Sequence, residues 1–378
     1  MSPLEAIDTL AAVVTADCNL RCAYCFQDRQ PPLYMSWPTL SAAVDVLLGS
    51  RRRPLRLSFL GGEPLLAFGL IVRAVHRVTR RQGLRRRVRL GLTTNGLLLT
   101  EPRVAFLERH RFDVQISADG VAPAQDLRAR GSFEPLDRLI DRLKTRHRGF
   151  FRRRVSFAMT VSAPAIPHLA DSFEYLLEKG ARNIAISAAM GQPRLSAEQA
   201  KALVRQFRRI RIRALKHYRA TGEVPLMNLR KSAPDPRRPV ESDWACAAPS
   251  GRDLVVDVDG EVVPCALLIH ACQRAIDPAV ESRLKAMGLG PVTKPEVLAL
   301  GLRSLPASAA AAGMFGPQAR KRSGRARCAT CRFAGACLVC PISCAWNPDS
   351  ADPNRIPDFQ CAFNRTDLAH RRRFPCQP

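Results

Sequence analysis

Two hydrophobic patterns alternate over the first 220 residues. Short continuous apolar runs have the length of buried strands, and longer stretches with apolar residues every three or four positions have the spacing of amphipathic helices. We expect strands at residues 10–15, 55–60, 88–93, 112–117, 155–161 and 183–187. We expect helices at residues 37–48, with Ser36 as N-cap, and at residues 65–78, 102–109, 134–144, 167–178 and 197–219.

Six strand–helix units in series predict an α/β fold. Such units form a parallel sheet covered by helices, here curled into a partial or full barrel. The loops that bind ligands in such sheets follow the carboxyl ends of the strands.

Three cysteines follow the first predicted strand. Cys18, Cys22 and Cys25 are separated by three and then two residues. These thiols reach one metal centre if the segment is a loop. In a four-iron cubane, three thiolates leave one iron open to a small chelating molecule.

Three further loops end successive strands with glycine or polar residues. Each segment alone could simply form a tight turn, because glycine, asparagine and aspartate are common turn residues. Together, at the ends of successive strands, the three loops would face one mouth of the barrel. They contain Gly61, Gly62, Glu63 and Pro64, then Thr94, Asn95 and Gly96, then Ser117, Ala118, Asp119 and Gly120.

The second half has a different organisation. Residues 222–243 are rich in proline, glycine and charge and are typical of a linker, and residues 254–263 alternate around Asp259 and Gly260 like a hairpin. From these residues alone, zinc and iron–sulfur centres are equally supported. The cysteines there are Cys246, Cys265, Cys272, Cys328, Cys331, Cys337, Cys340, Cys344, Cys361 and Cys376.

Composition limits the class of protein. The 378 residues, 46% of them hydrophobic, are enough for a large core and two domains. No apolar run is long enough to span a membrane and no export signal opens the chain, so we expect a cytoplasmic protein. The thirteen cysteines are then expected to bind metal rather than form disulfides.

The net charge of +26 is unusually high. Arginine triplets at residues 51–53, 85–87, 152–154 and 371–373 are spread along the chain, which favours solvated loops and helix ends over one nucleic-acid stripe. An acidic partner such as a peptide is the alternative.

The loop of Cys18, Cys22 and Cys25, followed by the Gly61–Gly62–Glu63–Pro64 segment, resembles the fingerprint of radical S-adenosylmethionine (SAM) enzymes. The resemblance covers about the first 220 residues and implies a partial (β/α)6 TIM-like barrel with one 4Fe-4S cluster. It implies that SAM is reductively cleaved to a 5'-deoxyadenosyl radical, which abstracts hydrogen from a substrate.

The resemblance also implies roles for individual residues. Cys18, Cys22 and Cys25 would ligate the cluster, and Tyr24 would lie where the loop contacts adenine. Gly61 and Gly62 would approach the methionine part, and Glu63 would accept from its ammonium. Ser117 and an arginine, Arg128 or Arg130, would hold the carboxylate and ribose. Pro64 and Asn95 complete the expected cofactor-binding set.

The second half resembles the SPASM extension of such enzymes, a small cysteine-rich α+β domain with up to two auxiliary 4Fe-4S clusters. The resemblance implies that Cys328, Cys331, Cys337 and Cys361 hold one cluster. Cys246, Cys265 and either Cys340 or Cys344 would hold the other, because Pro341 stands where the family places a cysteine. Cys272 is an additional ligand or a buried thiol, and Cys376 is expected to be free.

The expected domains are a barrel at residues 1–221, a linker at 222–243, an extension at 244–364 and a basic tail at 365–378. An insert at residues 273–327 is expected to be a flexible surface excursion; its helical part, near residues 297–305, alternatively covers the barrel mouth. No stretch before Leu10 is long enough for a separate leader-binding domain.

The expected function is modification of a ribosomally made precursor peptide by crosslink, thioether or epimerisation. An external one-electron donor such as flavodoxin or ferredoxin would supply electrons. Ala266 replaces the aspartate of sulfatase-maturing relatives, which argues against that activity. The alternatives are a small-molecule or protein side-chain substrate and, remotely, a zinc-binding module that contacts nucleic acid.

Overall fold

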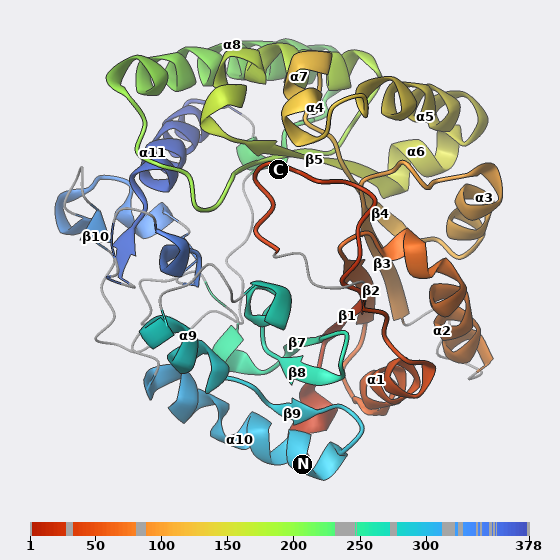
Figure 1. The fold of residues 1–378 in the computed structure, drawn as a ribbon. Coiled ribbons are helices and arrows are strands. Elements are labelled where there is room, and N and C mark those ends of the chain that lie inside the picture. Colours follow the sequence, from red (N-terminus) through yellow and green to blue (C-terminus); the bar gives the residue numbers. More distant parts are fainter. Residues whose placement is uncertain are drawn as a thin grey trace.

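The strands of the barrel and of the second half share one curved sheet. The computed structural model describes residues 2–27, 33–80, 88–230, 246, 248–272, 278–311, 322–323, 328–337, 339–340, 342–347, 350, 352 and 354–375. Within these residues, nine strands follow the order β6-β5-β4-β3-β2-β1-β7-β8-β9, and helices lie around the outside (Figure 1).

Six parallel strands form the first part of the sheet in chain order. All six predicted strands are confirmed, each within one residue at either end. The first strand is buried along nearly its whole length, which explains its continuous apolar sequence. The strands are β1 (Thr9–Thr15), β2 (Leu55–Gly61), β3 (Val88–Thr94), β4 (Asp113–Ser117), β5 (Val155–Val161) and β6 (Ile184–Ala188).

Helices connect these strands. The predicted helices are confirmed, and Ser36 caps the first by accepting a hydrogen bond from Thr39 N. Two of them begin with a 3-10 turn, Pro64–Ala67 and Ala163–His168. The main helices are α1 (Trp37–Gly49), α2 (Phe68–Arg80), α3 (Glu101–Arg109), α5 (Phe133–Arg146), α7 (Leu169–Glu178) and α8 (Ala197–Thr221), and two short helices not predicted are α4 (Ala122–Arg128) and α6 (Arg148–Arg154).

The hairpin of the second half extends the barrel sheet. β7 (Asp253–Val256) and β8 (Glu261–Val263) are antiparallel, as predicted, and Gly260 adopts the positive φ of 97° that their turn requires. β7 also pairs in parallel with β1, and β9 (Gly290–Pro291) pairs with β8. A hairpin expected in a separate domain is therefore joined to the first barrel strand.

Residues 365–375 differ from the expected basic tail. They continue α11 (Asp358–Arg372), which packs along α8. Phe363 meets Phe207 edge to face, and the buried His370 ring stacks on the same phenylalanine. An apolar face thus lies between the arginines that suggested a tail, while Cys376 lies outside the described residues.

The described part of the insert contains two helices, α9 (Pro278–Lys285) and α10 (Pro295–Ala311). α10 packs against β9 and against the 3-10 turn Pro3–Ala6 that precedes β1. It therefore lies at the amino end of the sheet (Figure 1) and does not cover the mouth.

The first residues of the expected linker are structured. Leu226 bridges Ile184, and the Asn228 amide exchanges hydrogen bonds with both backbone groups of Ile186. Residues 224–230 thus cover the free edge of β6, and residues 231–243 lie outside the described residues.

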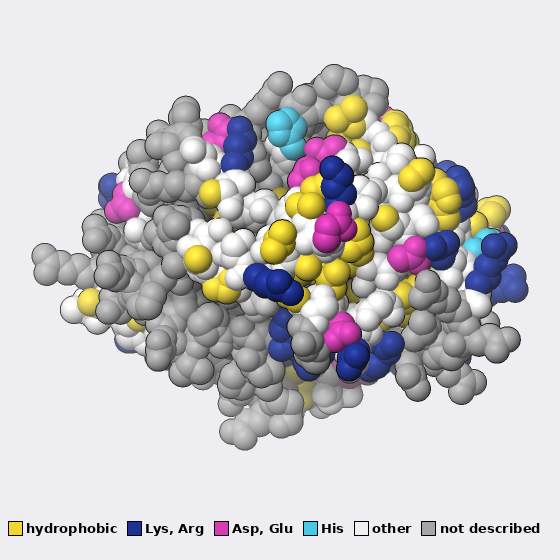
Figure 2. All heavy atoms as spheres, turned by 90° about the horizontal axis from the view of Figure 1, so that it is seen from below, with side chains coloured by type: hydrophobic (Ala, Val, Ile, Leu, Met, Phe, Trp, Pro, Cys, Tyr) yellow, Lys and Arg dark blue, Asp and Glu magenta, His cyan; other side chains and the backbone are white. Residues whose placement is uncertain are grey.

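Charges on the described surface are dispersed. On the face seen in Figure 2, lysine and arginine side chains form separate groups, most of them beside a carboxylate. No helix within the described residues is long and apolar enough to span a membrane.

His147 joins three helices at the outside of the barrel. Its Nδ1 lies 2.6 Å from Glu108 Oε2 and its Nε2 lies 2.8 Å from Glu101 Oε1. Burial lowers the pKa of His147, but the hydrogen bonds to the two carboxylates outweigh this and raise it. The imidazole thereby ties α3 to the junction of α5 and α6.

We expect His147→Gln to reduce stability in a pH-dependent way. A raised folded pKa contributes stability that is complete below the unfolded pKa, about 6.5, and is lost as pH rises through the folded pKa. The loss should be about 1–2 kcal/mol at pH 5.5–6 and smaller at pH 8.5 by urea unfolding. His168→Gln, without a carboxylate partner in the described structure, is the control; equal losses at both pH values would contradict the assignment.

Candidate functional site

The cysteine loop is fixed by its own backbone and by polar side chains. Thr15 Oγ1 donates to Leu33 O at 2.8 Å and accepts from Asp17 N at 3.0 Å. Leu20 N lies 3.4 Å from Cys18 Sγ and points its hydrogen at the sulfur. The sulfur of Cys18 therefore accepts a hydrogen bond from the loop backbone, and such a bond stabilises a thiolate.

Gly61 and Gly62 bring the end of β2 against this loop. Gly62 N donates to Thr15 O at 2.9 Å, and Glu63 N donates to Asp17 O at 2.8 Å. A Cβ on Gly61 would collide with the carbonyl of Thr15, and a Cβ on Gly62 with that of Asp17. The glycines thus permit contact between protein segments, a role that differs from the direct approach to a ligand expected from the sequence.

Glu63 is buried and connects two strand ends. Its carboxylate accepts from Leu65 N at 3.0 Å, from Thr94 Oγ1 at 2.7 Å and from Asn95 N at 2.7 Å. Burial raises the pKa of Glu63, and these three donors oppose the shift. The neighbouring Pro64 is buried at the start of the following 3-10 turn.

Asn95 returns this chain of contacts to the cysteine loop. Its Nδ2 donates to Asn19 Oδ1 at 2.8 Å, and its Oδ1 accepts from Leu97 N at 3.0 Å. The side chain expected to bind cofactor therefore holds the loop between Cys18 and Cys22.

Asp119 is the centre of a second network, on the other side of the loop. Its carboxylate accepts from Arg128 Nε at 3.1 Å and Nη2 at 2.9 Å, and from Thr160 N at 2.9 Å. It also accepts from the Tyr24 hydroxyl. Because Asp119 is 4% exposed and Arg128 is 7% exposed, this is a buried ion pair that links the loop to β4, α4 and β5.

The structure distinguishes the two candidate arginines. The Arg128 guanidinium lies 5.3 Å from the Tyr24 ring centroid and beside Cys22, whereas Arg130 is exposed. Burial lowers the pKa of Arg128, but the charge and hydrogen bonds of Asp119, together with Tyr24 and Cys22, outweigh it and the net pKa is raised. Ser117 closes β4 and is half-buried.

The three thiols of the loop are close enough for the charge of one to affect the pKa of another. Burial is the main cause that raises the pKa of Cys18 and of Cys22, and charge on Cys25 adds to both. Arg128 opposes the shift at Cys22. Cys25 is exposed and none of the three forms a disulfide, so the arrangement fits a group held by three sulfurs at the barrel mouth.

The other cysteines fall into two groups. Burial raises the pKa of Cys246 to about 12 and that of Cys265 to about 11, and both thiols face Cys340. In the second group, Cys344 and Cys361 are buried together, with Cys328 and Cys337 packed against them. Cys331 N donates to Cys328 O at 3.1 Å. No three His, Cys, Asp or Glu side chains in the described residues are arranged to hold a single metal ion.

Cys272 is a further buried thiol of the second half. Its Sγ donates to Ala266 O at 3.5 Å. Burial raises its pKa, and Asp257, Cys25 and Cys265 add to the shift, so the thiol faces the cysteine loop as well as Cys265.

From the sequence, Asp119 is expected in a loop at the barrel mouth without a role of its own, and Asn19 is not singled out. Asp119 looked like half of an Asp–Gly turn, and Gly120 does adopt φ 102° beside Ser172. Asn19 carried no signal beyond its place between two cysteines. The buried Arg128 nine residues after Asp119 was the one hint that a charge partner was needed.

Comparison with known proteins identifies the first part of the chain. Residues 12–161 match the model of the Radical SAM superfamily. An uncharacterized protein of Methanocaldococcus jannaschii is 27% identical over 48% of this chain and 62% of its own length. The GTP 3',8-cyclase of Xanthomonas campestris is 30% identical over 39% of this chain and 43% of its own.

A cysteine-type anaerobic sulfatase-maturating enzyme of Clostridium perfringens is 24% identical over 47% of this chain and 50% of its own. This chain thus spans less than two thirds of each of these relatives.

Two solved structures share the fold over nearly the whole chain. The anaerobic sulfatase-maturating enzyme anSMEcpe with bound AdoMet has a TM-score of 0.68 at 17% identity, covering 96% of this chain and 93% of its own. Streptococcus suis SuiB bound to S-adenosylmethionine has a TM-score of 0.56 at 14% identity, covering 94% and 77%. The arrangement of barrel and second half is therefore that of radical SAM maturases.

We expect Asp119→Asn to lower the free energy of unfolding by about 3 kcal/mol, because it leaves the Arg128 charge buried without its partner. Urea unfolding measures the loss. Asp171→Asn breaks the half-exposed pair with Arg209 and should cost under about 1 kcal/mol. Similar losses in both variants would show that the buried pair contributes no more to the free energy of unfolding than the half-exposed pair.

Proposed function

We propose that this chain, whose residues 12–161 form a radical SAM domain, is an enzyme that abstracts hydrogen from a ribosomally made precursor peptide. One observation carries the proposal: the three thiols of one loop lie between two polar networks at the carboxyl ends of the strands. The bound cluster would supply the electron that reductively cleaves SAM. The protein's part is to position the reactants and exclude water.

The two networks have complementary roles toward SAM. Glu63 Oε2 accepts from Asn95 N, and a carboxylate oxygen has capacity for a second donor, which suits the ammonium of SAM. Arg128 supplies a fixed cation for its carboxylate, held in place by Asp119. Tyr24, Gly61, Gly62, Pro64, Asn95 and Ser117 complete the wall of this pocket in our proposal.

The peptide substrate rests on the structural neighbours. anSMEcpe has been solved with AdoMet and the Kp18Cys peptide, and SuiB with its precursor peptide SuiA. Both structures share the fold over more than nine tenths of this chain. The outcome of hydrogen abstraction, whether crosslink, thioether or epimerisation, is left to experiment, and the electron donor is proposed to be a flavodoxin or ferredoxin.

We expect Cys22→Ala to abolish formation of 5'-deoxyadenosine, because one cluster ligand is lost. The measurement is chromatography of anaerobic reactions that contain reconstituted protein, SAM and dithionite. Cys376→Ala, outside every proposed ligand group, should retain wild-type activity.

Incubation with candidate peptides, followed by mass spectrometry, then identifies the substrate. A loss of two mass units indicates a crosslink, and solvent deuterium in a peptide of unchanged composition indicates epimerisation. Wild-type protein that forms no 5'-deoxyadenosine would refute radical chemistry. Turnover of a small molecule without peptide would redirect the substrate class.

The auxiliary clusters can be assigned in the same way. We assign Cys246, Cys265 and Cys340 to one cluster, because these three thiols face one another. The second cluster is assigned to Cys328, Cys331, Cys337 and Cys361. Cys344 is buried beside this second set.

We expect wild-type protein to hold about 12 iron atoms, four in each of three clusters. Cys340→Ala should lose the signal of the first auxiliary cluster alone. Cys344→Ala should disturb only the second. Iron and sulfide analysis with electron paramagnetic resonance measures both, and loss of the same signal in the two variants would refute the partition.

A further inference from the structure

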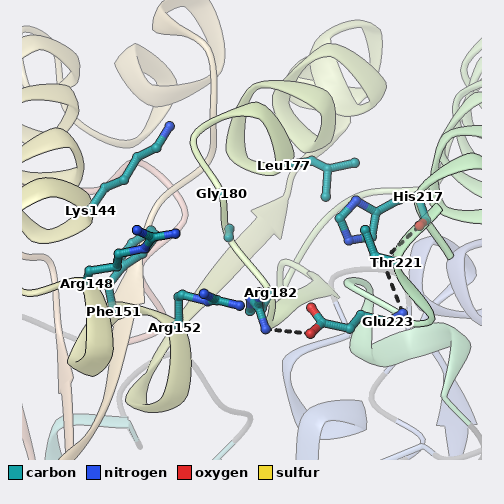
Figure 3. Close-up of a pocket in the computed structure, with 11 residues that line it drawn as sticks. Lys144, Arg148, Phe151, Arg152, Leu177, Gly180, Arg182, His217, Thr221 and Glu223 are labelled. Atoms are coloured by element: carbon teal, nitrogen blue, oxygen red, sulfur yellow. Dashed lines mark hydrogen bonds and ion pairs between the residues drawn. The ribbon is translucent and has the colours of Figure 1, made fainter.

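A pocket of about 330 Å³ opens at the end of the barrel opposite the cysteine loop. Its walls come from the last turn of α5, from α6, from the loop between α7 and β6, and from the end of α8 (Figure 3). All of these segments lie at the amino ends of β5 and β6. Because β5 has seven residues, the pocket is separated from the strand ends that face the cysteine loop by roughly 20 Å.

The walls of this pocket are strongly basic. Lys144, Arg148, Arg152 and Arg182 line it together with one carboxylate, Glu223. Arg182 pairs with Glu223 at 2.5 Å. The other three cations have no ion-pair partner among the residues that the structure describes.

The carboxyl ends of α5, α7 and α8 meet here, and their partial negative charge accounts for some of the attraction of cations. The carboxyl end of a helix does not explain Arg148, however, because it is the first residue of α6, and it lies on the same side of the pocket as Lys144 (Figure 3).

His217 adds a polar group without a partner. Its Nε2 is buried and has no hydrogen-bond partner within the described structure. The ring lies on the wall across the pocket from Lys144 and Arg148 (Figure 3). A buried nitrogen without a partner is costly unless a ligand or water satisfies it.

We propose that this pocket binds a phosphate ester of nucleotide size, at a site separate from the SAM site. The volume lies at the lower end of the range for small-molecule sites, roughly 300–1,000 Å³. Arginine forks match phosphate oxygens, and the cations surround one small concavity rather than a long track. Phe151, Leu177 and Ala181 give the pocket an apolar wall for the remainder of the molecule.

An acidic peptide is the competing ligand for a basic surface. A peptide would contact cations spread over an extended surface, whereas these converge on a space that holds a single small molecule. The geometry therefore favours the phosphate ester, and the experiment includes a peptide to test the difference.

The test is calorimetric titration of the reconstituted full-length protein with pyrophosphate, ATP and a hexaglutamate peptide, at about 0.1 M salt. Wild-type protein should bind both phosphate probes. The double variant R148Q/R152Q should bind them at least about tenfold more weakly. The control R146Q/R153Q removes the same two charges from neighbouring exposed positions outside the pocket and should change affinity less than about twofold.

A second variant is expected to change the affinity in the opposite direction. Glu223→Gln removes the one carboxylate that lines the pocket and should tighten pyrophosphate binding several-fold. Absence of phosphate binding, equal losses in the two double variants, or binding of hexaglutamate alone would each overturn the proposal. Because the readout is binding rather than SAM cleavage, the result is independent of the proposed radical chemistry.

Discussion

Two backbone hydrogen bonds determine the geometry of the barrel mouth. Thr15 O accepts from Gly62 N and Asp17 O accepts from Glu63 N, so the segment after β2 continues the parallel pairing of β1 into the cysteine loop. A loop with three thiols has no regular structure to hold it, and this extension supplies one. The side chains of Glu63 and Asn95 then close a ring of contacts that returns to Asn19.

The ion pair of Asp119 and Arg128 restrains the same loop from the opposite side. Burying two charges is costly unless each is paired and hydrogen-bonded, and here the aspartate accepts from four donor atoms of three residues, Tyr24, Arg128 and Thr160. The hydrogen bonds to this carboxylate offset the cost of burial, and they also orient the side chains of Tyr24 and Arg128. Arg128 is therefore held in one orientation, with its desolvation already complete.

The sequence predicts the strands well because each is short and either continuously apolar, as β1 is, or alternates apolar and polar residues, as β5 does. It fails where contacts between distant segments decide the structure. The arginines of α11 suggested a tail, although the Phe363 and His370 rings of this helix pack on Phe207 of α8. Asp119 resembled a turn residue until its partner was seen, and the spacing of Cys340 and Cys344 does not tell that Cys340 lies near Cys246 and Cys265 whereas Cys344 is buried beside Cys361.

The pairing of β7 with β1 has a consequence for engineering of this protein. A barrel cut away from the second half would expose the edge of β1 at Thr9–Ala12, in a strand whose side chains are almost entirely apolar. Uncovered edges of this kind template aggregation by strand addition. The second half thus protects the edge of the first strand. When domains are exchanged between relatives, the two halves should be transferred together.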